Sequence, residues 1–94
     1  MPHSRVDDSR VSRLDDVVAR NVRAERGRRR WTQAELADRL GWGRSTVGAV
    51  ETGARRLSIS DLPDLCRVFD VPLARLLVGA DPADVAVLRL HEQG

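Results

Sequence analysis

The spacing of apolar residues along the chain predicts an all-α protein. From residue 13 onwards, apolar positions recur every three or four residues, which is the period of a helix with one buried face. The predicted helices span residues 13–28, 32–40, 44–52, 60–69 and 72–77, with residues 82–91 forming either a sixth helix or a tail. A chain of 94 residues can bury one core but not two, so we expect a single compact domain.

Capping signals delimit the second and third helices. Residues 32–35 read as a capping box, in which the Thr32 hydroxyl accepts from the amide of residue 35 and the Glu35 carboxylate accepts from the amide of residue 32. Gly41 and Gly53 follow these helices and supply the permissive backbone that a helix C-terminus needs. Both helices are therefore predicted to be short.

The two ends of the chain differ from its middle. Residues 1–12 mix Pro, Ser, Asp and Arg with few apolar residues, which predicts a flexible N-terminal arm. Residues 13–79 form the domain, and residues 80–94 a short C-terminal helix or tail. The single cysteine, Cys66, excludes an internal disulfide, and no apolar run suits a signal peptide or a membrane helix. We therefore expect a soluble, cytoplasmic protein.

The predicted third helix presents an unusual surface. Only Val47 and Val50 occupy regular apolar positions, so one narrow stripe is buried. The opposite face carries small, hydrogen-bonding and basic residues, namely Arg44, Ser45, Thr46, Gly48, Ala49 and Thr52. Two short helices joined by a glycine-containing turn, with such a face on the second, describe a helix-turn-helix.

Basic residues are concentrated in the middle of the chain. The net charge is +2, and all 16 basic residues are arginines. Residues 1–19 carry three Arg and four Asp, residues 20–56 ten Arg and four acids, and residues 57–94 three Arg and six acids. The basic middle favours a polyanionic partner, because neutralised phosphates release counterions; a solvated charged face is the alternative interpretation. The absence of Lys is explained by coding bias, and no function is assigned to it.

Several short segments together resemble one known family. Their order and separation are those of the Cro/CI-type (XRE-like) family of bacterial and phage regulators, and the segments are TQAELA (32–37), LG (40–41), STV (45–47), ETG (51–53), VPL (71–73) and LL (76–77). The resemblance covers residues 14–78. It implies a compact five-helix helix-turn-helix domain that binds double-stranded DNA, to which the C-terminal segment could add a sixth helix.

The resemblance also implies roles for individual residues. Base edges would be contacted by Arg44, Ser45, Thr46, Gly48 and Ala49. Backbone phosphates would be contacted by Gln33, Thr32, Arg55, Arg56, Arg30 and Thr52. Gln33 would in addition brace Arg44, whose guanidinium can bond guanine O6 and N7 in a bidentate manner. Arg26 and Glu51 would form a buried structural ion pair.

Three positions depart from the family pattern. Arg30 stands where a glycine is usual between the first two helices, so it would have to adopt a left-handed conformation or the turn would differ. Gly43 replaces a capping Ser or Thr before the third helix. Gly48 lies inside that helix, where it either allows close approach to DNA or weakens the helix.

Other chemically suggestive residues are better explained by structure. Trp31 and Trp42 are interpreted as core residues rather than base-stacking platforms. His3 and His91 lack the ligand spacing of a zinc site, and Cys66 lies on an inward helical stripe. No catalytic constellation is found. We therefore expect neither an enzyme nor a metal or other cofactor.

The sequence thus predicts a sequence-specific transcriptional regulator, more specifically a repressor that binds a palindromic operator as a homodimer. Apolar Val85 and Leu88 in the C-terminal segment suggest where two copies could meet. Recognition helices about 34 Å apart would then read two half-sites. The alternative is an antitoxin or another protein-interaction module that binds and neutralises a partner protein. No membrane partner is expected.

Overall fold

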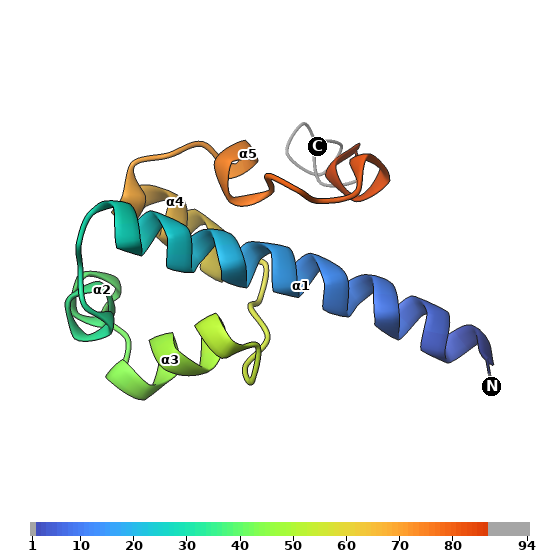
Figure 1. Cartoon of the computed structure of the whole chain (residues 1–94), viewed down its shortest axis with the longest axis horizontal. Helices are drawn as coiled ribbons and strands as arrows, with labels where there is room; N and C mark the ends of the chain where they lie inside the picture. Colours follow the sequence, from blue (N-terminus) through green and yellow to red (C-terminus); the bar gives the residue numbers. More distant parts are fainter. Residues whose placement is uncertain (1, 87–94) are drawn as a thin grey trace.

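The computed structural model describes residues 2–86, with side chains from residue 14 onwards. Within these residues the regular secondary structure is entirely helical (Figure 1). The helices are α1 (Pro2–Arg28), α2 (Gln33–Leu40), α3 (Arg44–Thr52), α4 (Asp61–Phe69) and α5 (Leu73–Leu76). The all-α class predicted from the sequence is confirmed. Residues 82–86 are also helical, and the rest of the predicted sixth helix, 87–91, lies outside the described residues.

The main difference from the sequence prediction concerns the start of α1. The helix begins at Pro2 rather than at residue 13, so residues 2–12 are helical and not irregular. Pro2 is compatible with the first turn, no further proline interrupts the segment, and extending an existing helix costs little compared with starting one. Figure 1 shows this part of α1 projecting beyond the other helices. The predicted start was wrong, whereas the flexibility of the arm remains a prediction.

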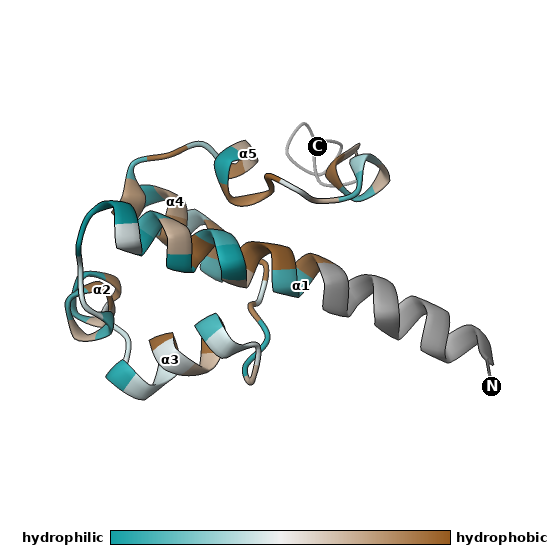
Figure 2. Cartoon of the chain, viewed as in Figure 1, coloured by the Kyte–Doolittle hydropathy of each residue, from teal (hydrophilic) through white to brown (hydrophobic). Residues whose placement is uncertain are grey.

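The core lies where α1, α2, α3, α4 and α5 meet. Figure 2 shows apolar residues concentrated in the middle of α1 and on α4, while α3 is mostly white and teal. The buried cluster combines small and large side chains from all five helices and from the residue after α5, namely Val18, Val22, Leu36, Ala37, Val47, Leu65, Phe69, Leu76 and Leu77. Burying these side chains removes apolar surface from water, which stabilises the fold by about 25 cal/mol per Å². This packing holds α2 and α3 against the other helices.

The capping box at the start of α2 is present. The Glu35 amide donates to the Thr32 hydroxyl at 3.0 Å, and the Thr32 amide donates to the Glu35 carboxylate at 3.0 Å. The hydrogen bond that the Glu35 carboxylate accepts from the Thr32 amide is the main cause that lowers the pKa of Glu35, because it favours the charged form. Gly41 ends α2 with a φ of 73°, the left-handed conformation that glycine adopts without strain. Both ends of α2 are thus determined locally.

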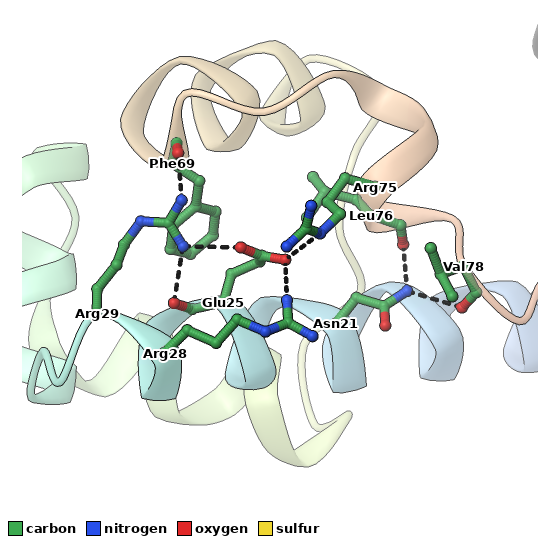
Figure 3. A network of polar contacts seen from close by, with 8 residues as sticks. All are labelled: Asn21, Glu25, Arg28, Arg29, Phe69, Arg75, Leu76 and Val78. Atoms are coloured by element: carbon green, nitrogen blue, oxygen red, sulfur yellow. Dashed lines mark hydrogen bonds and ion pairs between the residues drawn. The ribbon is translucent and has the colours of Figure 1, made fainter.

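A buried carboxylate joins the end of α1 to α4 and α5 (Figure 3). Glu25 is only 2% exposed and accepts from three arginines: Arg28, Arg29 at 2.7 Å and Arg75 at 2.9 Å. Arg29 also donates to the Phe69 carbonyl at the end of α4. Burial disfavours the charged carboxylate, but the hydrogen bond from Arg29 and the charges of the three arginines outweigh it and lower the pKa of Glu25.

A neighbouring amide strengthens the same junction. The Asn21 side chain donates to the carbonyls of Leu76 at 2.7 Å and Val78 at 3.0 Å (Figure 3). These carbonyls lie at the end of α5, where a short helix leaves acceptors without partners of its own. Asn21 and Glu25 therefore hold the C-terminal part of the domain against α1, on the opposite side of α1 from α3 (Figure 1).

The turn between α1 and α2 contains a strained arginine. Arg30 has a φ of 57°, so the structure resolves the departure at this position by a left-handed backbone rather than by a different turn. For a residue with a side chain, the left-handed conformation costs roughly 1–2 kcal/mol. Glycine avoids this cost but loses more backbone entropy when the protein folds. Arg30→Gly is therefore expected to raise the free energy of unfolding by about 1 kcal/mol. Thermal or urea denaturation measures the change.

Arg23→Gly is the matched control for this prediction. Arg23 is exposed in the middle of α1, where glycine should lower stability by about 1 kcal/mol. A loss of stability in Arg30→Gly as large as that in Arg23→Gly would contradict the strain argument.

Candidate nucleic-acid interface

Helices α2 and α3 form a compact pair joined by a tight turn. After Gly41, the Trp42 amide donates to the Ala37 carbonyl at 2.9 Å, and Gly43 is the extended residue preceding α3, with φ −70° and ψ 150°. Gly43 offers no side chain to cap the helix, so the first amides of α3 have no side-chain acceptor there. Val47 and Val50, each 1% exposed, attach α3 to the core. The other face of α3 points outwards.

The outward face of α3 contains the residues predicted to meet base edges. Arg44, Ser45 and Thr52 are exposed, whereas Thr46, Gly48 and Ala49 are half-buried. Arg44 forms no hydrogen bond or ion pair with any described residue, so its five guanidinium donors remain available. The Thr52 hydroxyl instead donates to the Ala49 carbonyl at 3.2 Å. This face can make close polar contacts with a flat or grooved polyanion.

An ion pair ties α3 to α1. Arg26 donates from Nε to Glu51 Oε2 at 2.6 Å and from Nη2 to Oε1 at 2.9 Å, a bidentate arrangement. Its third nitrogen, Nη1, donates to the Trp31 carbonyl at 2.8 Å. The hydrogen bond to Glu51 outweighs burial and raises the pKa of Arg26. The pair that the family resemblance implied is therefore a defined contact, and it fixes the end of α3.

Gln33 also belongs to this group. Its Nε2 donates to Glu51 Oε1 at 3.2 Å, so Gln33 is held by Glu51 rather than by Arg44, the side chain that it was expected to brace. A Cβ atom at Gly48 would lie 3.5 Å from Gln33 Oε1, which is an ordinary van der Waals distance. A small side chain would therefore fit at Gly48, and the approach of the start of α2 to the middle of α3 does not require glycine there.

The remaining candidates for phosphate contact surround this pair of helices. Thr32 and Arg30 are exposed just before α2. Arg55 and Arg56 follow α3, with side chains 44% and 66% exposed. Helix N-termini attract anions through free amides and the macrodipole, so Thr32 and Gln33 lie at a suitable position. Gln33, at the start of α2, also contacts α3 through Glu51 and lies close to Gly48.

Arg55 and Arg56, the two arginines directly after α3, each lie near an acidic side chain. Arg55 Nη2 is 3.9 Å from Asp61 Oδ2, and Arg56 Nε is 3.8 Å from Asp15 Oδ2. Burial raises the pKa of Asp15, although the charge of Arg56 opposes this effect. Asp61 also accepts from the Ser58 amide at 2.9 Å. The contacts of these acids with Arg55 and Arg56 could not be found from local sequence, because the paired residues come from different segments.

Neither a metal-ligand cluster nor a membrane-spanning helix is found in the described part of the chain. Residues 14–86 contain no group of three His, Cys, Asp or Glu side chains that could hold a metal ion. Within the described residues, none of the helices combines the length and the apolar character needed to cross a membrane.

The geometry defines a helix-turn-helix protein, and comparisons with known proteins agree. A family model described as "Helix-turn-helix domain" matches residues 17–78. The solved structure of a hypothetical transcription factor, NHTF, from Neisseria is 31% identical in sequence, covering 80% of this chain and 84% of that chain with a TM-score of 0.65. No curated protein matches significantly. The chain belongs to the helix-turn-helix domain family, which confirms the predicted recognition at that level.

Proposed function

We propose that this protein is a sequence-specific double-stranded DNA-binding transcriptional regulator of the Cro/CI type. The outward face of α3 carries the proposal. It presents small polar residues and an arginine without a partner in the described part of the chain, on a helix whose other side packs in the core. An α-helix of this kind fits the major groove, where base edges present distinct patterns of donors and acceptors. The family and the similarity to a transcription factor support this assignment.

The proposed contacts divide into two classes. Arg44, with the small residues of α3, reads base edges, and the residues around the two helix N-termini and after α3 bind phosphates. Phosphate contacts position the protein and make binding dependent on salt, whereas base contacts determine sequence preference. The protein acts by binding rather than by catalysis, and the more specific proposal is a repressor that occupies a palindromic operator.

A selection of genomic DNA fragments with the purified protein tests this function. We expect enrichment of one sequence with two inverted half-sites, and binding that weakens as salt increases. No enriched sequence together with no salt-dependent binding would reject DNA binding and favour the alternative, a module that neutralises a partner protein. Co-purification of a second chain would then identify that partner.

We also propose that the protein binds DNA as a homodimer, with a contact surface different from the one suggested by the sequence. Val85, which the sequence suggested as a contact between two copies, is half-buried and packs against the core of its own chain. Leu88 lies outside the described residues. Ile59, in contrast, is 69% exposed. It borders a mainly apolar groove of about 190 Å³ that is also lined by Leu57 and Leu62. A protruding apolar side chain beside an apolar groove suits a two-fold interface, in which each copy supplies both.

Ile59→Asp is expected to dissociate the dimer. The new charge would have to be buried at the contact, which is costly unless it is paired. Light scattering should give twice the mass of one chain for the wild type and one chain mass for the variant at the same concentration. Val78→Asp is the matched control, because Val78 is 61% exposed but does not line this groove. A wild-type mass of one chain, with and without DNA, would contradict dimerisation.

A further inference from the structure

The guanidinium group of Arg55 lies between an aromatic ring and a carboxylate. Its Cζ is 5.3 Å from the ring centroid of Trp42, which precedes α3, and its Nη2 is 3.9 Å from Asp61 at the start of α4. Trp42 itself is half-buried and packs against the core, and Asp61 is fixed by the Ser58 amide. A long side chain from the segment after α3 thus contacts two groups that are themselves anchored by other contacts.

The contacts of Arg55 differ from those of the arginines that stabilise the fold. Arg26 and Arg29 are 18% and 26% exposed, and their nitrogens donate to carboxylates and carbonyls. Arg55 is 44% exposed, and its guanidinium donates no hydrogen bond to another described residue. The ring contact and the distant carboxylate orient this group without using its donors, which leaves it prepared for an external acceptor.

Such an arrangement lowers the entropic cost of binding a phosphate. A flexible arginine side chain loses rotamer entropy when it is fixed in one geometry. A cation–π contact restricts the side chain before the ligand arrives, and the five donors of the guanidinium then remain free for phosphate oxygens.

We propose that Trp42 is a positioning residue for DNA binding, which holds the Arg55 guanidinium over its ring so that Arg55 meets the DNA backbone in a preformed orientation. This inference rests on the proposed function. It gives Trp42 a role beyond the packing that its sequence context predicts, because the same ring contacts the core and supports the arginine.

A double-mutant cycle tests the proposal. Binding of labelled mixed-sequence duplex DNA is measured at several salt concentrations for the wild type, Trp42→Leu, Trp42→Phe, Arg55→Ala and Trp42→Leu/Arg55→Ala. A cation–π contact of about 0.5–1 kcal/mol predicts that Trp42→Leu weakens binding roughly two- to fivefold. Trp42→Phe should retain most of the affinity because it keeps an aromatic face. In the Arg55→Ala background, Trp42→Leu should have no further effect.

The possible outcomes separate this proposal from its alternatives. If Trp42→Leu reduces DNA affinity equally with and without Arg55, Trp42 acts through the fold. If Trp42→Leu binds DNA more tightly than the wild type, the ring keeps Arg55 away from DNA. Either result overturns the proposal. If the wild type binds no duplex at all, the proposed function fails, and the positioning role fails with it. Thermal denaturation checks folding, and Trp42→Met, which keeps a long apolar side chain, replaces the leucine variant if that variant is unfolded.

Discussion

Replacing Glu25 with alanine is expected to lower the free energy of unfolding by about 3–5 kcal/mol, the cost of breaking a buried ion pair. The carboxylate is 2% exposed and is the shared acceptor for Arg28, Arg29 and Arg75. Without it, Arg29, which is 26% exposed and also joins the Phe69 carbonyl, would keep its charge in a poorly solvated place. A small domain typically has only about 5–15 kcal/mol of stability, so urea denaturation should show a large shift.

Arg28→Ala is the matched control, because Arg28 belongs to the same network but is 56% exposed. Exposed ion pairs contribute about 0–1 kcal/mol, and a similar loss in both variants would contradict the role of burial. The pH dependence gives a second check. The pKa of Glu25 lies below its ordinary value of 4.5, so its contribution is present above that pH and is lost as the pH falls through the lower value in the folded protein. Glu25→Ala should lack this part of the acid-induced loss.

The local elements of the fold were accessible from the sequence because local chemistry determines them. The capping box of Thr32 and Glu35 and the glycine after α2 are signals that lie within a few residues of the structure they produce. The narrow apolar stripe of Val47 and Val50 likewise identified the buried positions of α3. The start of α1 was not accessible in the same way, because a polar segment with few apolar residues can continue a helix that is stabilised elsewhere.

Only part of the polar network around Glu25 could be predicted from the sequence. Arg28 and Arg29 follow Glu25 by three and four residues, so their contacts are allowed by helical periodicity. Arg75 comes from a distant helix, and only the packing of α5 against α1 brings it to the carboxylate. Burial of this glutamate also depends on that packing. A residue that appears in the sequence as a solvated helical charge is therefore a central structural contact.

In the candidate interface, too, some features were predicted from the sequence and others were not. The face of α3 followed from the small number of apolar residues in one helix, and the Arg26–Glu51 contact was suggested by family resemblance. The contact of Trp42 with Arg55 was not predicted, since these residues flank α3 and meet only when their side chains extend towards each other. Gln33 was expected to contact Arg44, but its amide is occupied by Glu51. This leaves Arg44 without a partner among the described residues.

Arg44→Ala is consequently expected to abolish most of the sequence preference in DNA binding. A bidentate contact with guanine contributes about 1–3 kcal/mol of discrimination, which corresponds to roughly a fivefold to 150-fold loss of affinity for the selected sequence. Arg44 is exposed and forms no ion pair with the residues whose side chains the structure describes, so the fold should be unaffected. Affinity is measured by anisotropy on the selected duplex and on a duplex with one changed half-site.

Arg23→Ala provides the control for charge, because Arg23 is an exposed arginine of α1 and its removal changes the net charge by the same amount. If long-range attraction alone explained the effect, both variants would lose affinity equally on both duplexes. A base contact instead requires that Arg44→Ala lose affinity mainly on the selected duplex and bind the two sequences with nearly equal strength. Arg55→Ala should weaken both duplexes together and lessen the salt dependence, because a phosphate contact carries no sequence information. Equal weakening of both duplexes by Arg44→Ala would place Arg44 on the DNA backbone and leave base recognition to the other residues of α3.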